Sequence, residues 1–190
     1  MHLTSLLVST LSNQLLALSG WLDKAEAFAA DWGERPDALL ALQLAPDMFP
    51  LTTQLRFAAF QSQEPVYRLR GETVPEPVLQ VRQEGRDGIE RPGTWGEARA
   101  RVTEARQLLA SVPSGAFDHM AEQPLAHDLP NGMVFDMTGA QYVRDWALPQ
   151  AAFHQMIAYA LLRQAGVPLG KVDYVPHMFG YLRPGTAPAA

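Results

Sequence analysis

The chain has 190 residues, of which 47% are apolar and 18% charged, a balance typical of one globular domain with a sizeable core. Its net charge of −5 argues against nucleic-acid binding, because phosphate contacts need a basic surface. It has no cysteine, which excludes disulfides, thiolate nucleophiles and cysteine-bound zinc, and fits a cytoplasmic protein.

The first predicted element is a long amphipathic helix over residues 3–31. Its apolar residues recur at spacings of three and four, as in a bundle helix: Leu7, Leu11, Leu15, Leu18, Leu22, Ala25 and Ala29. Glu26 lies one turn from Leu22, at the expected edge of this buried face. Ser9 and Ser12 interrupt the apolar residues, so we expect neither a signal peptide nor a membrane span.

A short helix is predicted from Pro36 to about residue 44, and a second long helix follows it toward Gln63. Asp47 stands where an N-cap is expected, with Pro50 in the tolerant first turn. The inward residues of this helix would be Leu51, Leu55, Ala58 and Ala59. Pro65 should end or kink the helix, because an interior proline costs ~3 kcal/mol or more.

Residues 71–93 are rich in helix-breaking residues and are predicted to form a long surface excursion. These residues are Gly71, Pro75, Pro77, Gly85, Gly88, Pro92 and Gly93. A third long helix is predicted over 94–112. The inward residues of this helix would be Ala98, Val102, Ala105, Leu108 and Leu109.

A β-hairpin is predicted next, because Asn131-Gly132 separates two short apolar runs at 124–129 and 133–137. Thr138 can cap a short helix that leads into the last long one. That last helix would begin at Leu148, with Pro149 in its first turn, and would end before a left-handed Gly166. Its apolar face would hold Phe153, Ile157, Ala160 and Leu161, with His154 beside this stripe.

Four long amphipathic helices predict an all-α fold, a four-helix bundle with crossover connections and a small β-hairpin before the last long helix. One domain would cover residues 1–175, with 71–93 as its surface excursion. Residues 176–190 would form an irregular C-terminal tail.

Three segments of the sequence resemble a known family. They are KAEAFA at 24–29, APDMFPL at 45–51, and the region 148–174 with its LP, FH, AYA and GVPLGKVDY motifs. Together they resemble an uncharacterised bacterial family of the DinB/YfiT-like superfamily of helical bundles, over residues 3–70 and 94–175. The connecting stretch 71–93 departs from the family, which usually has a shorter acidic segment there.

This resemblance implies a DinB-like fold and a place where chemistry would be found. Characterised members of the superfamily bind a divalent metal through three histidines, and some are thiol-dependent transferases or isomerases. At the corresponding places this chain has Asp47, Gln150 and His154, of which only His154 is a histidine. Gln150 is a poor ligand for a transition metal, so the metal chemistry is implied only weakly.

Each candidate residue has a functional and a structural interpretation. His154 would be a catalytic base or metal ligand, or else a partly buried histidine bound to a carboxylate such as Glu26. Asp47 would be a metal ligand, although its role as N-cap would suffice to explain it. Tyr142, Trp146, Tyr159 and Phe153 could line a pocket between helices, although aromatic residues at helical spacing are more often core.

A second group, His119, Glu122, His127 and Asp128, is interpreted as a solvated loop, because its spacing matches no helical metal motif. The sequence contains no serine-hydrolase, dinucleotide-binding, P-loop or zincin motif.

Three functional hypotheses remain. The preferred one is a small-molecule-binding or degenerate relative of metal-dependent transferases, with a polar site at His154, Glu26, Asp47, Gln150 and Tyr159. The second is an active divalent-metal-dependent transferase or hydrolase that uses His154, with Asp47 as a further metal ligand. The third is a structural module that forms a homodimer. We expect no nucleic-acid or membrane partner, and we prefer no cofactor over a divalent metal.

Overall fold

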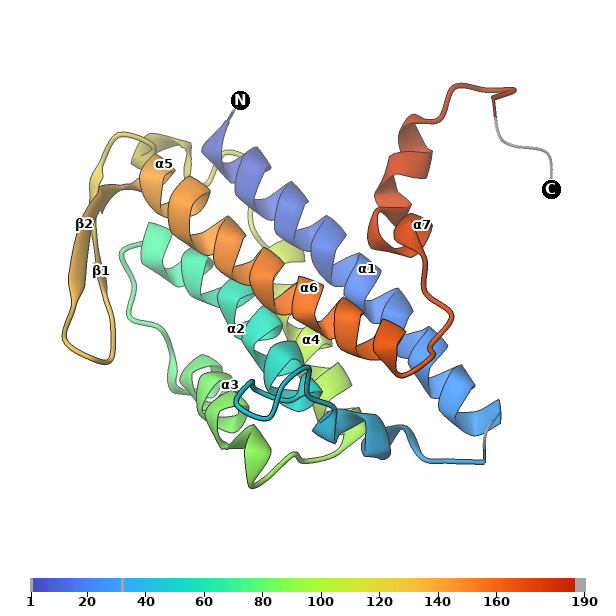
Figure 1. Ribbon diagram of the computed structural model, residues 1–190. Coiled ribbons are helices and arrows are strands. Elements are labelled where there is room, and N and C mark those ends of the chain that lie inside the picture. Colours follow the sequence, from blue (N-terminus) through green and yellow to red (C-terminus); the bar gives the residue numbers. More distant parts are fainter. Residues whose placement is uncertain (1, 32, 187–190) are drawn as a thin grey trace.

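Four long helices form the body of the protein in a computed structural model that describes residues 2–31 and 33–186 (Figure 1). They are α1 (Leu3–Asp31), α2 (Leu51–Leu69), α4 (Trp95–Ala110) and α6 (Leu148–Gln164). Helices α1 and α2 each pack against both α4 and α6, so α1 and α2 lie diagonally across the bundle. The predicted all-α four-helix bundle with crossover connections is therefore confirmed.

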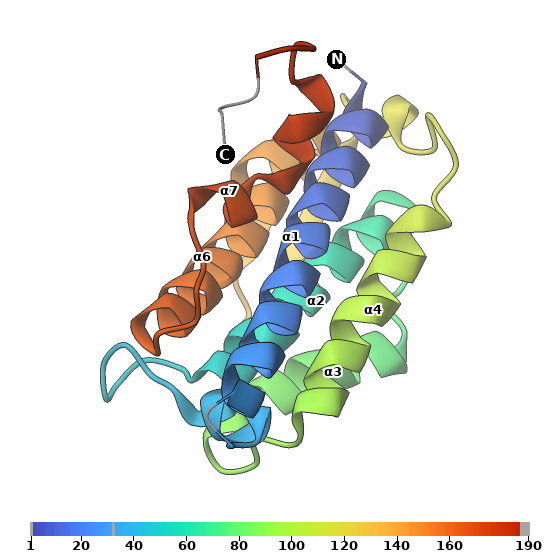
Figure 2. The ribbon, with the colours of Figure 1, turned by 90° about the vertical axis from the view of Figure 1, so that its right-hand side faces the viewer.

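The shorter elements connect these helices. They are η1 (Pro36–Ala41), α3 (Glu76–Arg86), η2 (Asp87–Ile89), η3 (Asp118–Met120), β1 (Pro124–Asp128), β2 (Val134–Thr138), α5 (Gly139–Gln141), η4 (Tyr142–Ala147), α7 (Lys171–Tyr174) and η5 (Pro176–Tyr181). Strands β1 and β2 form the predicted antiparallel hairpin, in a register that places Leu125 opposite Met137. Figure 1 shows this hairpin at one end of the bundle, beside the start of α6, and Figure 2 shows α1 and α4 side by side.

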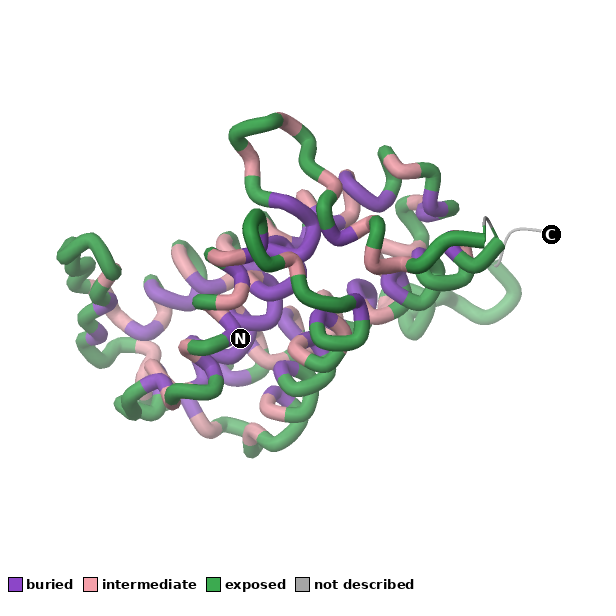
Figure 3. Tube along the Cα trace, turned by 90° about the horizontal axis from the view of Figure 1, so that it is seen from below, coloured by how far each residue is buried: buried purple, intermediate pink, exposed green. Residues whose placement is uncertain are grey.

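The core lies where the helices face one another (Figure 3). All seven apolar residues predicted for the inner face of α1 are buried, from Leu7 to Ala29. On α4, four of the five predicted residues are buried, and Leu108 is partly buried. Thr94 caps α4, because its hydroxyl accepts a hydrogen bond from the Glu97 amide while the Glu97 carboxylate accepts one from the Thr94 amide.

Two predictions about α2 are corrected, its N-cap and its end near Gln63. Asp47 does not cap the helix: it lies in an exposed turn, and α2 begins at Leu51 after Pro50. Pro65 does not end the helix either, since α2 continues to Leu69. Pro65 is itself buried, because α2 packs against α3, α4 and α6, and this tertiary packing outweighs the local cost of a proline.

The region 71–93 is not a surface excursion throughout. Helix α3 occupies Glu76–Arg86, and it packs against α2 through the buried residues Val78 and Val81. Gly85 permits close approach, because a Cβ there would lie 2.6 Å from the ring of Phe57. Pro75 and Pro77 lie at the start of α3, where a proline is tolerated.

The last long helix differs from its prediction at its start and in its buried face. Residues 139–164 are continuously helical, and η4 is a π-helical turn that joins α5 to α6. The residues that α6 buries are Ala151, Gln155, Ala158, Leu161 and Leu162, whereas the Phe153 side chain is 55% exposed. Gly166 has the predicted left-handed φ, 97°.

The C-terminal segment is also more ordered than predicted, because η5 lies within the predicted irregular tail. The end of that tail, 187–190, lies outside the described residues, as do positions 1 and 32 of the predicted domain. In the described part of the chain, no helix has the length and apolarity needed to cross a lipid bilayer.

Candidate functional site

A pocket of about 170 Å³ lies between α2, α3, the hairpin and the η4–α6 helix. We call it the His127 pocket. It is lined by Phe57, Phe60, Gln61, Glu64, Arg82, Arg86, His127, Asp128, Leu129, Pro130, Trp146 and His154. Its α2 residues recur every three or four positions, at 57, 60 and 61, and 64, so one face of α2 forms a wall of the pocket.

His127 is almost completely buried in the wall of this pocket, with 1% of its surface exposed. Strand β1 alternates between exposed and buried residues, and Leu125 and His127 share its inner face. The His127 ring lies 4.6 Å from the Trp146 ring and 5.2 Å from the Tyr142 ring, measured between centroids. Both aromatic residues come from the π-helical turn η4.

Buried polar atoms around His127 have no hydrogen-bond partner among the described residues. They are Nδ1 and Nε2 of His127, the Tyr142 hydroxyl, Nε1 of Trp146 and Oε1 of Gln61. Leaving such a group unsatisfied costs about 1–3 kcal/mol, and such groups are few in native proteins. Gln61, His127 and Trp146 line the pocket, but these atoms are themselves buried, so a bound polar molecule would reach them only after the side chains move.

His154 has a defined tautomer. Gln54 Nε2 donates to the Phe49 carbonyl at 3.0 Å, and so Gln54 Oε1 is the atom that contacts His154 Nδ1, at 2.9 Å. Nδ1 therefore donates to this oxygen, and in a neutral ring Nε2 is left as an acceptor. The ring lies 5.0 Å from the Phe57 ring and lines the pocket.

Both pocket histidines are neutral at pH 7. Burial lowers the pKa of His127 to about 4, and the positive charge of Arg68 acts in the same direction. Burial alone lowers the pKa of His154 to about 4. The two imidazoles thus offer nitrogen acceptors and N–H donors without bringing positive charge into the pocket.

Charged side chains form the part of the pocket wall that holds Glu64 and Asp128. Arg68 pairs with Glu64 on the previous turn of α2 at 3.1 Å, and it also bonds to Asp128 at the end of β1. Burial raises the pKa of Glu64, although the adjacent Arg68 opposes this effect. The pairing neutralises a carboxylate that is 3% exposed and ties the hairpin to α2.

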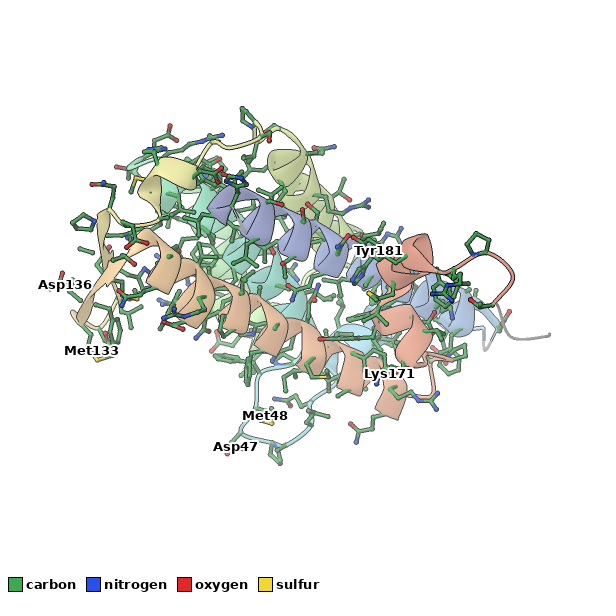
Figure 4. All side chains as sticks on the ribbon, turned by 90° about the horizontal axis from the view of Figure 1, so that it is seen from above. Asp47, Met48, Met133, Asp136, Lys171 and Tyr181 are labelled. Atoms are coloured by element: carbon green, nitrogen blue, oxygen red, sulfur yellow. The ribbon has the colours of Figure 1, made fainter. Side chains whose placement is uncertain are left out.

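The structure does not bring together the residues that were predicted to form one site. Asp47 points outward from the loop before α2 (Figure 4). Glu26 is exposed and pairs with Arg99 of α4 at 3.0 Å. Because Gln54 occupies the place expected for a carboxylate, the predicted His154–Glu26 contact is wrong.

Gln150 and Tyr159 also lie apart from the His127 pocket. Gln150 is partly buried one turn before His154, but it does not line the pocket. Tyr159 packs edge-on against Trp21 and Tyr174, with centroids 5.3 Å and 5.9 Å away, in a separate cluster under α7. His154 lines the pocket, and so does Trp146, one of the aromatic residues predicted to line a pocket between helices.

The side chains do not fit the metal site that the resemblance implies. Among the described residues, no three His, Asp or Glu side chains are grouped so that they could hold a metal ion. Of the three positions implied, Asp47 is exposed in a turn, Gln150 offers an amide, and only His154 offers an imidazole. We therefore assign no metal-dependent step to this site.

The main residue that sequence analysis missed is His127, which was interpreted as part of a solvated loop. A signal was present, because the predicted strand alternates and places His127 on the same face as the apolar Leu125. Arg82 was missed for a different reason: the region 71–93 was not predicted to contain helix α3, which brings this arginine to the pocket.

Comparisons with known proteins agree with this fold. A family model described as "Domain of unknown function (DUF1993)" matches residues 3–175. A crystal structure of a DinB family member protein from Shewanella denitrificans is 28% identical, with a TM-score of 0.76, and the match covers 98% of this chain and 96% of that one. Among curated proteins, no significant match was found. The chain therefore belongs to the DUF1993 family, and it has the DinB-like helical-bundle fold.

Proposed function

We propose that this protein binds a small polar molecule in the His127 pocket. The observation that carries the proposal is the set of buried polar atoms without partners on Gln61, His127 and Trp146, which line one pocket. A ligand that bonds to these atoms would remove a cost of about 1–3 kcal/mol for each, and that recovered energy would contribute to affinity.

The remaining pocket residues support binding rather than proton transfer. A general base works best when its pKa is near the working pH. The pKa of about 4 makes His154 a weak base, but its Nε2 atom remains a good hydrogen-bond acceptor. Gln54 holds the ring in one tautomer and orientation, so the acceptor is already positioned before a ligand arrives.

The proposal is tested by screening a fragment library by NMR while following the imidazole signals of His127 and His154 and the indole N–H of Trp146. Binders are expected to shift these signals together and to raise the melting temperature. His127→Leu should remove the shifts, whereas Tyr159→Phe, in the separate aromatic cluster, should leave them unchanged. A library in which no fragment moves the three side chains would overturn the proposal.

Two broader expectations accompany this function. The lack of cysteine supports a cytoplasmic location, and the exposed apolar residues Phe153 and Met156 on α6 would suit a homodimer. Light scattering after size-exclusion chromatography would test the second, because Phe153→Ser should shift a dimer toward monomer. A monomer at all concentrations would contradict the homodimer.

A further inference from the structure

The carboxylates that line the His127 pocket are paired with an arginine, whereas the arginines that line it are not paired with a carboxylate of the described residues. Its two carboxylates, Glu64 and Asp128, are both bound to Arg68. Its two arginines, Arg82 and Arg86 on α3, make no ion pair with the described residues. Counting Arg68 with the lining residues gives three positive and two negative groups, a local net charge of +1 in a chain whose net charge is −5.

Arg82 is held in a geometry that leaves its hydrogen-bond donors available. Its guanidinium carbon lies 5.3 Å from the centroid of the Phe60 ring, in a cation–π contact. A guanidinium stacked in this way keeps the N–H groups of its edge free for two parallel bonds to a carboxylate. No hydrogen bond from Arg82 to another described residue occupies these groups.

A second pocket, of about 420 Å³, adjoins the first one and shares Glu64, Arg82 and Asp128 with it. The further carboxylate on this side, Glu72, is paired with Arg70 at 3.9 Å. Each carboxylate that lines either pocket thus has an arginine partner. Arg82 therefore makes no ion pair with a described residue on either side of the shared wall, although its positive charge acts on Glu64 and opposes the rise in the pKa of that carboxyl.

The wall contributed by α2 and η4 has a different character. Phe57, Phe60 and Trp146 line it, and the Phe135 ring lies 5.9 Å from that of Trp146 toward the outside. The pocket is thus lined by aromatic rings and, in contact with one of them, by the cationic Arg82, and His127 and Gln61 line it as well. Flat apolar groups fit the rings, and a planar anion fits Arg82.

We propose that the ligand is a small organic carboxylate with an aromatic or other flat apolar body, whose carboxylate binds Arg82 and whose body packs against Phe57 and Trp146. This inference rests on the proposed binding function, because it names the class of molecule that the same pocket accepts. Arg86 is exposed at the pocket edge and strengthens the attraction at a distance.

The test uses matched pairs of fragments that differ in charge but not in shape, such as phenylacetate and phenylacetamide. Dissociation constants are measured from the Trp146 indole N–H shift at low salt. We expect the acid to bind roughly tenfold more tightly than the amide, a ratio set by one charge-assisted bond. Arg82→Gln should reduce this ratio to about one. Arg106→Gln, an exposed arginine of α4 outside the pocket, makes the same change in net charge and should preserve the ratio.

The outcomes separate this inference from the function on which it rests. If amides or amines bind as tightly as acids and move the His127 and Trp146 signals, the carboxylate inference is wrong and the binding function stands. If inorganic phosphate alone competes as well as phenylacetate, the apolar body is not recognised, and the inference is again wrong. If no fragment of any charge moves these signals, the binding function fails and the inference fails with it.

Discussion

The protein contains two clusters of three rings, one under α7 and one between the hairpin and η4. They differ in whether their buried polar atoms have hydrogen-bond partners. In the first, Trp21, Tyr159 and Tyr174 pack under α7. The Trp21 indole donates to the Asp173 carbonyl at 2.7 Å, and Lys24 pairs with the Asp173 carboxylate at 2.7 Å. In the second, His127, Tyr142 and Trp146 keep buried polar atoms that have no partner among the described residues.

The difference separates an element that stabilises the fold from one that is suited to binding. A buried donor with a partner contributes to stability, whereas an unpartnered one lowers it. Proteins tend to keep such costly groups where they serve a function. The first cluster should therefore respond to mutation mainly through stability, and the second mainly through ligand binding.

The largest expected effect is on the first cluster. Trp21→Ala removes a ring that is 1% exposed and should lower the free energy of unfolding by about 3–5 kcal/mol. Urea denaturation measures this, and Trp21→Phe, which keeps a ring but loses the bond to Asp173, should cost about 1–2 kcal/mol. A loss below about 1 kcal/mol in Trp21→Ala would show that this cluster does not stabilise the fold.

Mutation in the wall of the His127 pocket should lower the free energy of unfolding nearly as much. Arg68→Met leaves the buried Glu64 carboxylate without its partner and should cost about 3 kcal/mol at pH 7. The double variant Glu64→Gln with Arg68→Met should recover much of this loss, because no unpaired charge stays buried. Arg106→Met, on the exposed face of α4, is the control. Equal stability of Arg68→Met and wild type would contradict the structural role of the pair.

Acid should destabilise the protein through the two pocket histidines. Their pKa values of about 4 lie below the value near 6.5 expected for the unfolded chain, so between these values the unfolded state binds more protons. The stability they contribute is complete above pH 6.5 and falls as the pH decreases toward 4. Lowering the pH from 7.0 to 5.5 should cost roughly 2 kcal/mol.

Variants identify which groups cause this acid sensitivity. In His127→Leu, the loss of stability between pH 7.0 and 5.5 should be about halved. Burial raises the pKa of Glu64, so this carboxyl adds stability, rather than losing it, as the pH falls toward 4.5. The pH dependence of the stability of Glu64→Gln measures this contribution. Urea denaturation at each pH gives the values. An unchanged pH dependence in His127→Leu would show that this ring is not held neutral.

The smallest expected effect has opposite signs at the two histidines. At pH 7, His127→Leu removes unpartnered buried atoms and should raise the free energy of unfolding by about 1 kcal/mol. His154→Leu removes the donor to Gln54, whose side chain is 3% exposed, and should lower it by about 1 kcal/mol. A loss in both variants would show that His127, like Trp21, is a structural residue.

Local sequence patterns were enough to predict most of the helices and the hairpin. The apolar stripe of α1, the cap at Thr138 and the left-handed Gly166 each depend on residues within one or two turns. The alternation in β1 carried equally local information about His127, although the sequence analysis did not use it. The errors at Pro65 and in α3 arose where packing against α2 outweighed local helix breakers.

By itself, the sequence determined the bundle, because helix periodicity and capping are properties of neighbouring residues. Only the tertiary structure decided the site. His154 meets Gln54, 100 residues earlier, and Arg68 meets Asp128, 60 residues later. Neither the choice of Gln54 over Glu26 nor the approach of Arg82 to Phe60 follows from spacing along one helix. Such contacts depend on which faces of α2, α3 and α6 turn toward each other once the core is packed.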